Sequence, residues 1–478
     1  LNMTHNIPVN QNLVDMEYAV RGPIPRRAMD LKKDGHKIYA CNIGNPQALK
    51  QKPISFYRQV VALIEASDNI QRERNLTKFA KNNSDIFEGS GINIISTDII
   101  DYSEEFLHNC FTGMGAYTES QGPGFIREAI SQFIDLRDKN DIASDPESIF
   151  LTDGASDAVR RILELLITGR NDGIMIPIPQ YPLYSATVKR CGGVQVGYYP
   201  DEEKDWALTP DILEEAYQNA TTQGVDVKCI VIINPGNPTG AILDKQSIDG
   251  IVNFVEKYDL SIIADEVYQE NLYGGSFISM ASAVGSRDIP LFSLHSISKG
   301  FTGECGHRGG YMEIRNMPIM KDLNVNLSEL LLKQASVSLC SNTVGQAIVY
   351  MMVKPPKTGS EPYNTYAEEK NTILRELETK AALIKESFKQ MEGMDCFGRT
   401  GAMYLFPRIN SLPKDITDFD YCMRLLEETG ICTVNGGGFG QQPGTSHLRI
   451  AFLPPVQSIT RFLPDWIRFH NRFIKSPH

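Results

Sequence analysis

The sequence predicts an α/β protein with a mostly parallel β-sheet, followed by a smaller α+β region towards its end. Two observations support this fold class. From about residue 120 onward, short apolar runs alternate with amphipathic helices, and most of the runs are apolar along nearly their whole length. Strands of that kind are buried on both faces, which is typical of a parallel sheet covered by helices on both sides.

The elements of this sheet are expected where the apolar pattern changes its period. A helix begins near Phe125, because apolar residues recur after it at three- and four-residue spacing. Two further helices have apolar faces of the same spacing, one between Ala155 and Leu166 and one between Ile248 and Val255. The strands are expected at 148–152, 174–177, 194–198, 230–233, 260–264 and 291–295.

A stretch of prolines, glycine, serine and lysine at 354–362 marks the boundary between the two regions. A charged helix is expected from Tyr366 to about Glu392, and an amphipathic helix near 462–474. With 478 residues, the chain is long enough for two or three domains. We therefore expect an N-terminal arm with part of the small domain at 1–65, a large domain at 66–353 and a C-terminal small domain at 354–478.

The composition excludes several classes of protein. Hydrophobic residues make up 42% and charged residues 22% of the chain, so large cores can form. The net charge of -11 argues against a nucleic-acid or anionic-membrane binder. Nine cysteines occur without a CxxC pair, so free thiols are expected rather than a zinc or other metal site. No apolar run has the length of a membrane span, and the first residues lack the features of a signal or transit peptide, so we expect a soluble cytoplasmic protein.

Polar side chains follow three of the predicted strands, at the points where the strands end. The first of these loops contains Asn237, the second begins with Asp265 and contains Tyr268, and the third contains Lys299. The carboxyl ends of parallel strands meet at the same edge of a sheet, and ligands bind there in open α/β folds. We therefore expect an amide, a carboxylate, a phenol and an amine to converge on one crevice.

The order of these motifs resembles a known family. NPGNPTG at 234–240 is followed by ADEVYQ at 264–269, by SISKG at 296–300 and by Arg308. This order resembles that of the fold-type I aminotransferases, which use pyridoxal 5'-phosphate (PLP), over about residues 40–460. The resemblance implies a seven-stranded, mostly parallel sheet in the large domain. Within the family, the alanine aminotransferase branch is similar in the segments 42–47, 117–130, 177–184 and 304–314.

The resemblance implies two catalytic residues. Lys299 matches the amine that forms a Schiff base with the aldehyde of PLP and then moves the proton in transamination. Asp265 matches the carboxylate that keeps the pyridine nitrogen protonated. The adjacent Glu266 is the rival for this role, but the alternation of side chains along a strand turns it to the opposite face.

Further residues match positions around the ring and the substrate. Asn237 and Tyr268 match the residues that hydrogen-bond the phenolic oxygen of the ring, which favours the anion of that oxygen. Tyr181 matches the aromatic side chain that stacks on the ring. Arg449 matches the arginine that binds the substrate α-carboxylate, and Gly44 allows the backbone to approach that carboxylate closely. Asn237 is also assigned to substrate binding.

The cofactor phosphate requires hydrogen-bond donors and positive charge. The loop at 152–156 joins a strand to a helix, so backbone N–H groups at the helix start can face an anion. Asp153 and Asp157 are neighbouring acids that conflict with a phosphate unless they cap the helix or face away. The spacing after Lys299 leaves two candidates for the arginine that binds the phosphate: Arg308 and, as the weaker alternative, Arg315. The residues assigned to the phosphate are Ala155, Ser156, Ser296 and Arg308.

Tyr117 matches a tyrosine that reaches the phosphate from a partner subunit, so the resemblance implies a homodimer with shared active sites. The glycine-rich run 436–440 is interpreted as a mobile loop over the site rather than a phosphate loop. The partners that the resemblance implies are small amino acids, 2-oxo acids and a second copy of the chain. No nucleic-acid or membrane partner is expected.

The implied activity converts L-alanine and 2-oxoglutarate to pyruvate and L-glutamate by ping-pong transamination. Three alternatives stay open: a glutamate:glyoxylate aminotransferase, a PLP lyase of the aminocyclopropane-carboxylate synthase type, and an inactive binding protein of the same fold. A Rossmann dehydrogenase is disfavoured, because no GxGxxG motif follows the first strand of a βαβ unit. The sequence identifies no residue for the distal carboxylate of glutamate.

Overall fold

The structure is a computed structural model that describes residues 4–18, 22–110 and 112–476. The chain folds into two compact units. Unit 1 comprises residues 1–44, 159–293 and 380–478, and unit 2 comprises residues 45–158 and 294–379. Each unit is therefore built from segments that lie far apart in the sequence.

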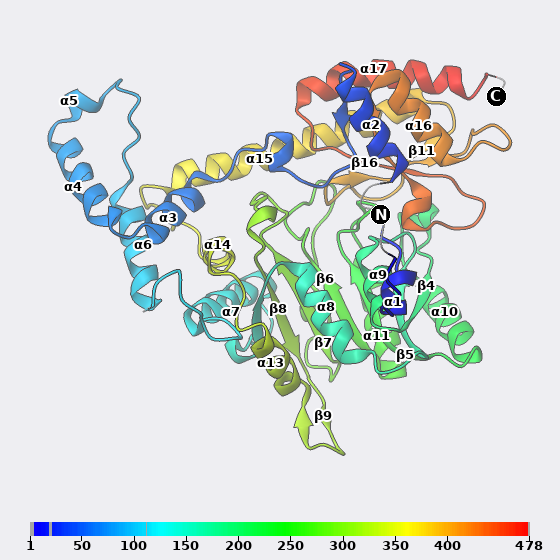
Figure 1. The fold of residues 1–478 in the computed structure, drawn as a ribbon, viewed down its shortest axis with the longest axis horizontal. Coiled ribbons are helices and arrows are strands. Elements are labelled where there is room, and N and C mark those ends of the chain that lie inside the picture. Colours follow the sequence, from blue (N-terminus) through cyan, green and yellow to red (C-terminus); the bar gives the residue numbers. More distant parts are fainter. Residues whose placement is uncertain (1–3, 19–21, 111, 477–478) are drawn as a thin grey trace. The chain divides into compact units, whose positions relative to one another are not determined.

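A seven-stranded sheet has the strand order β2-β8-β7-β6-β5-β3-β4 (Figure 1). β3 pairs in parallel with β4 and with β5, and β5 pairs in parallel with β6, whereas β2 and β8 are antiparallel. The predicted α/β class with a mostly parallel seven-stranded sheet is confirmed, but the antiparallel pair was not foreseen. The strands are β2 (Ile149–Thr152), β3 (Asp172–Pro177), β4 (Val194–Tyr198), β5 (Asp226–Ile233), β6 (Ser261–Asp265), β7 (Leu291–Ser296) and β8 (Gly310–Arg315).

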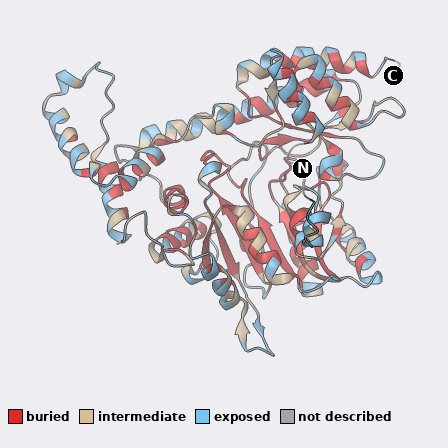
Figure 2. Ribbon diagram, viewed as in Figure 1, coloured by how far each residue is buried: buried red, intermediate tan, exposed pale blue. Residues whose placement is uncertain are grey.

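The helices of unit 1 bury apolar faces and expose polar ones (Figure 2). In α11 (Lys245–Tyr258), Asp244 caps the start by accepting a hydrogen bond of 2.8 Å from the N–H of Ser247. The predicted apolar face from Ile248 to Val255 is buried. The helix ends at Asp259, whose φ of 52° lies in the left-handed region. The other helices of this part are α9 (Leu183–Arg190), α10 (Pro210–Thr222) and α12 (Met280–Val284).

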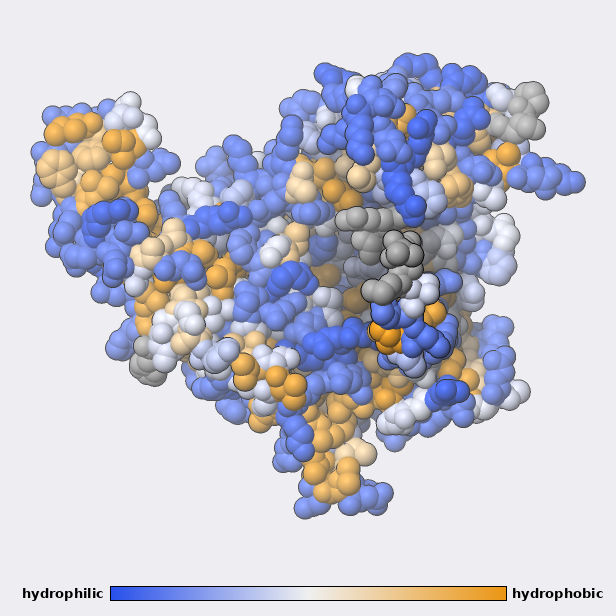
Figure 3. Space-filling view, viewed as in Figure 1, coloured by the Kyte–Doolittle hydropathy of each residue, from blue (hydrophilic) through white to orange (hydrophobic). Residues whose placement is uncertain are grey.

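Unit 2 has a core between helices and the strands β2 and β8. Its rings make edge contacts, as between Phe106 and Phe125 with centroids 5.3 Å apart. The sequence patterns did not predict the helices α4 to α6. β9 (Ile319–Met320) and β10 (Val325–Asn326) form an antiparallel hairpin with exposed apolar side chains, visible as orange atoms in Figure 3. The helices are α3 (Ser55–Glu65), α4 (Asn69–Asn82), α5 (Ser84–Phe87), α6 (Thr97–Asn109), α7 (Gly124–Asp138), α13 (Leu327–Val337) and α14 (Thr343–Val353).

The C-terminal part of unit 1 has short strands covered by α16 (Asp418–Thr429) and α17 (Val456–Phe473). β16 pairs antiparallel with both β12 and β15, and this places Arg449 in the middle of a three-stranded sheet. The N-terminal strand β1 pairs in parallel with β14. The remaining elements are α1 (Gln11–Asp15), α2 (Pro23–Lys33), β1 (Tyr39–Ala40), α15 (Tyr363–Ser387), β11 (Met394–Asp395), β12 (Tyr404–Leu405), β13 (Arg408–Ile409), β14 (Ile431–Cys432), β15 (Val434–Asn435) and β16 (Leu448–Ala451).

Candidate active site

Lys299 lies in unit 2, in the turn that follows β7. Its carbonyl accepts a hydrogen bond of 3.2 Å from the N–H of Gly303, and the N–H of Glu304 donates to the carbonyl of Ile297 at 2.8 Å. These bonds fold the chain back directly after a strand whose residues are all buried. The side chain of Lys299 is half-buried, so the turn holds an amine at the carboxyl end of β7.

Arg308 lies against the start of α8 (Ala155–Leu166). Its guanidinium donates to Oγ of Ser156 at 3.0 Å and to Oγ of Ser298 at 3.4 Å. Gly154 has a φ of +83° and allows this close approach, because a Cβ there would lie 2.4 Å from Nη2 of Arg308. A cation, two hydroxyls and the first turn of a helix thus surround one position, which is the donor set that a phosphate requires.

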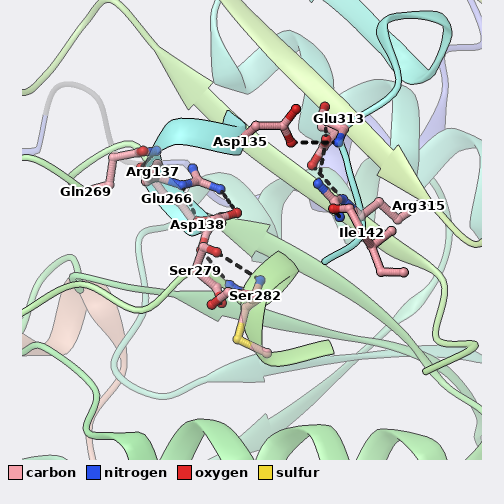
Figure 4. A network of polar contacts seen from close by, with 12 residues as sticks. Asp135, Arg137, Asp138, Ile142, Glu266, Gln269, Ser279, Ser282, Glu313 and Arg315 are labelled. Carbon is pink, nitrogen blue, oxygen red and sulfur yellow. Dashed lines mark hydrogen bonds and ion pairs between the residues drawn. The ribbon is translucent and has the colours of Figure 1, made fainter. Parts of the chain in front are cut away.

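The second serine of SISK, Ser298, is the one that contacts Arg308. Oγ of Ser296 instead accepts a hydrogen bond of 3.3 Å from the N–H of Ser298. Ser298 was not among the residues predicted from the sequence, although its place directly before Lys299 was a usable signal. The alternative arginine, Arg315, lies on β8 and pairs with Glu313 at 3.0 Å (Figure 4). The geometry within unit 2 therefore favours Arg308 over Arg315.

The acids beside this cradle are bound to N–H donors. Oδ1 of Asp153 accepts hydrogen bonds from the backbone N–H and from Nδ2 of Asn342, at 2.8 and 2.9 Å. Oδ2 of Asp157 accepts a bond of 2.9 Å from the N–H of Asp153. Asn342 in turn caps α14, by accepting a bond of 2.6 Å from the N–H of Gly345. The sequence suggested a conflict between these acids and a phosphate. Their hydrogen bonds to N–H donors reduce that repulsion.

Asp265 ends β6 in unit 1 and is buried beside a tyrosine that the sequence analysis did not select. The hydroxyl of Tyr184 donates a hydrogen bond of 2.5 Å to Oδ2 of Asp265. Burial, and then the charge of Asp265, raise the pKa of Tyr184 well above its ordinary value. Tyr184 therefore keeps its proton and acts as a donor. Its position at the end of the segment 177–184 was the signal that could have identified it.

The neighbouring carboxylate, Glu266, serves another element. Its Oε2 accepts a hydrogen bond of 3.0 Å from the N–H of Met280, the first residue of α12. Its backbone carbonyl accepts a bond of 2.9 Å from Nε2 of Gln269, and Figure 4 shows these residues together with Ser279. Asp265 and Glu266 thus have different partners, which agrees with the expected alternation along the strand.

Arg449 and Asn237 are joined within unit 1. Nη1 of Arg449 donates to Oδ1 of Asn237 at 3.0 Å, and Nη2 donates to the carbonyl of Asn42 at 2.8 Å. The guanidinium carbon lies 4.3 Å from the ring centroid of Tyr404 and 4.9 Å from that of Phe439. In the described part of the chain, the buried Nε has no hydrogen-bond partner. A buried N–H group of this kind is available to a carboxylate ligand.

Two candidate tyrosines are paired with tyrosines that the sequence analysis did not select. The hydroxyl of Tyr268 donates to that of Tyr404 at 3.1 Å. The hydroxyls of Tyr181 and Tyr18 lie 3.0 Å apart. Burial, and then the nearby Tyr18, raise the pKa of Tyr181, so its phenol stays neutral. No sequence spacing links these partners, because each pair joins segments that are distant along the chain.

The remaining predicted residues have simpler surroundings. The side chain of Tyr117 is 74% exposed. Gly44 lies two residues after Asn42 in the loop that follows β1. The glycine run forms a 3-10 helix, η6 (Gly436–Phe439), whose buried Phe439 packs on the guanidinium of Arg449.

Comparison with known proteins identifies the family. Residues 74–463 match the family model described as aminotransferase class I and II, and the chain belongs to this family of PLP-dependent transaminases. A protein of Dictyostelium discoideum named probable alanine aminotransferase, mitochondrial, is 41% identical, and the match covers 97% of this chain and 88% of the relative. The solved structure of an alanine aminotransferase from Pyrococcus furiosus is 25% identical, with a TM-score of 0.75, and the match covers 97% of this chain and 100% of that one.

Other relatives have different names. Glutamate–glyoxylate aminotransferase 1 of Arabidopsis thaliana is 39% identical, and the match covers 98% of this chain and 95% of the relative. A protein of Saccharomyces cerevisiae named inactive alanine aminotransferase is 41% identical over 97% of this chain and 93% of the relative. Proteins of this similarity thus differ in substrate and in activity.

The expected cytoplasmic location is wrong. The Dictyostelium relative is named mitochondrial, and so are alanine aminotransferases of Saccharomyces cerevisiae and Arabidopsis thaliana that are 41% and 39% identical. The names of these relatives therefore contradict the expected location. Within the described ranges, no helix has both the length and the apolar character needed to cross a bilayer.

The residues present fit PLP. Gly154 leaves space for the guanidinium of Arg308, and a phosphate is the natural ligand of that cradle. Asp265 is a buried carboxylate held by a phenol, which suits a protonated pyridine nitrogen. The buried Nε of Arg449 suits the carboxylate of an amino acid. These residues therefore offer partners for the phosphate and the pyridine nitrogen of the cofactor and for the α-carboxylate of an amino acid.

Proposed function

We propose that this chain transfers the amino group of L-alanine to 2-oxoglutarate, which gives pyruvate and L-glutamate. The observation that carries the proposal is the similarity to alanine aminotransferases, about 40% identical over nearly the whole chain. The buried Arg449 supports it, because every substrate of this reaction has an α-carboxylate.

Lys299 bears the cofactor and moves the proton. PLP, when bound, supplies an aldehyde for the amino group and a ring that withdraws electrons. With the cofactor held and the substrate bound, the free amine of Lys299 would accept the substrate α-proton and hold it for return to the reacting group. The half-buried position of Lys299 after a fully buried strand limits the freedom of its amine.

Asp265 holds the proton of the pyridine nitrogen, and Tyr184 holds Asp265 in the required orientation. A fixed, buried carboxylate acts strongly on the ring because little water screens it. The residues assigned to the rest of the ring are Asn237 and Tyr268 at the phenolic oxygen and Tyr181 against the ring face. The phosphate residues are Ala155, Ser156, Ser296, Ser298 and Arg308.

The substrate carboxylate binds to Arg449, with Asn237 and the backbone at Gly44 beside it. Asn237 and the Asn42 carbonyl hold two nitrogens of the guanidinium, and two aromatic rings hold its plane. This arrangement fixes the orientation of Arg449 before the substrate binds, which reduces the entropy lost on binding.

We propose a homodimer in which Tyr117 reaches the phosphate of the partner's site. Tyr117 is 74% exposed, as expected of a side chain that acts on another subunit. Unit 2 also exposes Phe79, Ile86 and Ile92, each more than half. Sedimentation should give a dimer, and a mixture of Tyr117→Phe and Lys299→Ala subunits should recover activity in mixed dimers only if the sites are shared.

Absorbance of the purified protein tests the main proposal. The wild type should be yellow, L-alanine should bleach it, and 2-oxoglutarate should restore the colour. Lys299→Ala should abolish borohydride trapping of the cofactor, whereas Lys257→Ala, at a 62% exposed lysine, should not. A colourless wild type that PLP cannot restore would overturn the proposal. Fractionation of cells should place the protein in mitochondria.

Glutamate:glyoxylate transamination is the second candidate, because relatives with that name are 39% identical over 98% of the chain. A panel of amino donors and 2-oxo acids separates the two by the rate of the spectral change. A PLP lyase would turn over an amino acid without any 2-oxo acid, whereas a transaminase stops after one half-reaction.

A further inference from the structure

Tyr404 contacts two candidate residues that have different roles. Its hydroxyl lies 3.1 Å from the hydroxyl of Tyr268, which is assigned to the cofactor ring. Its ring lies beneath the guanidinium of Arg449, with 4.3 Å between the guanidinium carbon and the centroid. The side chain of Tyr404 is 2% exposed, so both contacts are made in a buried environment.

The backbone around Tyr404 is fixed by close contacts. Gly240, at the end of the loop that holds Asn237, has a φ of +68°, and a Cβ on it would lie 2.1 Å from the carbonyl oxygen of Tyr404. The N–H of Gly401 donates to the carbonyl of Gly240 at 2.6 Å, and the N–H of Ala402 donates to that of Asn271 at 3.0 Å. This explains the glycine at 240, and it shows that Tyr404 has little freedom to shift.

The two contacts use different parts of the side chain. The hydroxyl bonds to Tyr268, whereas the face of the ring attracts the cation of Arg449. We propose that Tyr404 is a positioning residue for both sites: its hydroxyl orients Tyr268 towards the ring oxygen of the cofactor, and its ring fixes the guanidinium that binds the substrate carboxylate. This inference rests on the proposed function of Tyr268 and Arg449.

The hydroxyl of Tyr404 also makes Tyr268 a better donor. When Tyr268 donates to the cofactor, Tyr404 donates to the oxygen of Tyr268, and hydrogen bonds in such a chain strengthen one another. Among the described residues, Tyr404, Arg449 and Asp265 are titratable or charged groups that act on Tyr268. Burial raises the pKa of Tyr268 most, Tyr404 raises it further, Arg449 lowers it, and Asp265 raises it. The phenol therefore stays protonated.

The test separates the hydroxyl from the ring with Tyr404→Phe and Tyr404→Leu in the PLP-loaded protein. Two quantities are measured: the pH midpoint of the visible absorbance change of the cofactor, and the affinity for propionate, an unreactive carboxylate. Tyr404→Phe should raise the midpoint by roughly 0.3 to 1 pH unit, because the ring oxygen loses stabilisation as an anion. Its propionate affinity should stay within about twofold of the wild type, because the ring under Arg449 remains.

Tyr404→Leu should change both quantities, with propionate affinity about threefold to tenfold weaker. Tyr421→Phe is the matched control: this buried hydroxyl bonds His470 at 2.8 Å and Trp466 at 3.0 Å instead, so neither quantity should change. If Tyr404→Leu does not fold, Tyr404→Phe alone tests the inference, because this variant should change the pH midpoint but not the propionate affinity. An unchanged midpoint in Tyr404→Phe, or a loss of propionate affinity in that variant, would overturn the inference. A wild type that does not bind PLP would contradict the proposed function instead.

Discussion

The hydroxyl of Tyr184 donates a hydrogen bond of 2.5 Å to the carboxylate of Asp265, and both side chains are buried. A hydrogen bond to a charged group contributes about 1.5 to 3 kcal/mol. The hydrogen bond from Tyr184 fixes the orientation of the carboxylate and stabilises its charged form. If Asp265 has the role proposed above, Tyr184 is a positioning residue for that carboxylate.

Tyr184→Phe should lower kcat/KM by about tenfold or more, because Asp265 loses its donor but keeps its charge. Asp265→Asn should cost more, about 100-fold, because it removes the charge. Both variants should retain PLP through the phosphate cradle. Steady-state kinetics and the absorbance of bound cofactor measure the two effects. Near-normal turnover of Asp265→Asn would remove Asp265 from the proposed role.

Gly154→Ala should weaken the affinity for PLP by about tenfold to 100-fold, because the added Cβ displaces the guanidinium of Arg308. Excess PLP should restore most of the activity. Gly224→Ala is the control for backbone strain, since Gly224 has a similar φ of +80° and open space around it. Equilibrium dialysis of the apoprotein gives both affinities. Equal effects of the two substitutions would indicate strain alone.

Arg449→Lys should raise the KM for L-alanine by about tenfold or more, because a single ammonium cannot replace a planar fork held by Asn237 and Asn42. Arg424→Lys, at an exposed pair with Glu428, should leave the KM unchanged. Initial rates over a range of alanine concentrations distinguish the two variants. An unchanged KM in Arg449→Lys would contradict the assignment.

The free energy of unfolding should decrease as the pH is lowered, because of His295. Burial, and then the nearby Arg137, lower the pKa of His295 from 6.5 to about 3, and neither ring nitrogen has a hydrogen-bond partner within the described residues. Between pH 6.5 and 3, the unfolded state binds a proton here that the folded state does not bind. The free energy of unfolding should therefore decrease by about 1.4 kcal/mol for each pH unit below 6.5.

His295→Phe should remove this contribution, and the ring contacts with Phe133 and Tyr311 suit an aromatic replacement. Denaturant unfolding of the wild type and the variant at pH 7 and pH 5 measures the difference. If both proteins lose the same stability between these pH values, His295 is protonated in the folded state.

The residue pattern predicted most strands of the sheet, the loops at its carboxyl edge and the order of Asn237, Asp265 and Lys299, but not the antiparallel pair of β2 and β8. Apolar runs and helical spacing are local properties, and burial on both faces of a strand leaves a direct trace in the residue types. The division at 1–65, 66–353 and 354–478 stays a prediction. The cytoplasmic location predicted from the sequence is contradicted by the relatives that are named mitochondrial.

The hydrogen-bond partners of the candidate side chains could not be predicted from the sequence. Tyr184 is 81 residues from Asp265, Tyr404 is 136 residues from Tyr268, and Asn42 is 407 residues from Arg449. Hydrogen bonds between such segments depend on how separate elements pack, and no spacing in the chain records that packing. The same reason explains why Ser298 was not predicted, although it lies next to Lys299. Its contact with the guanidinium of Arg308 is visible only in the tertiary structure.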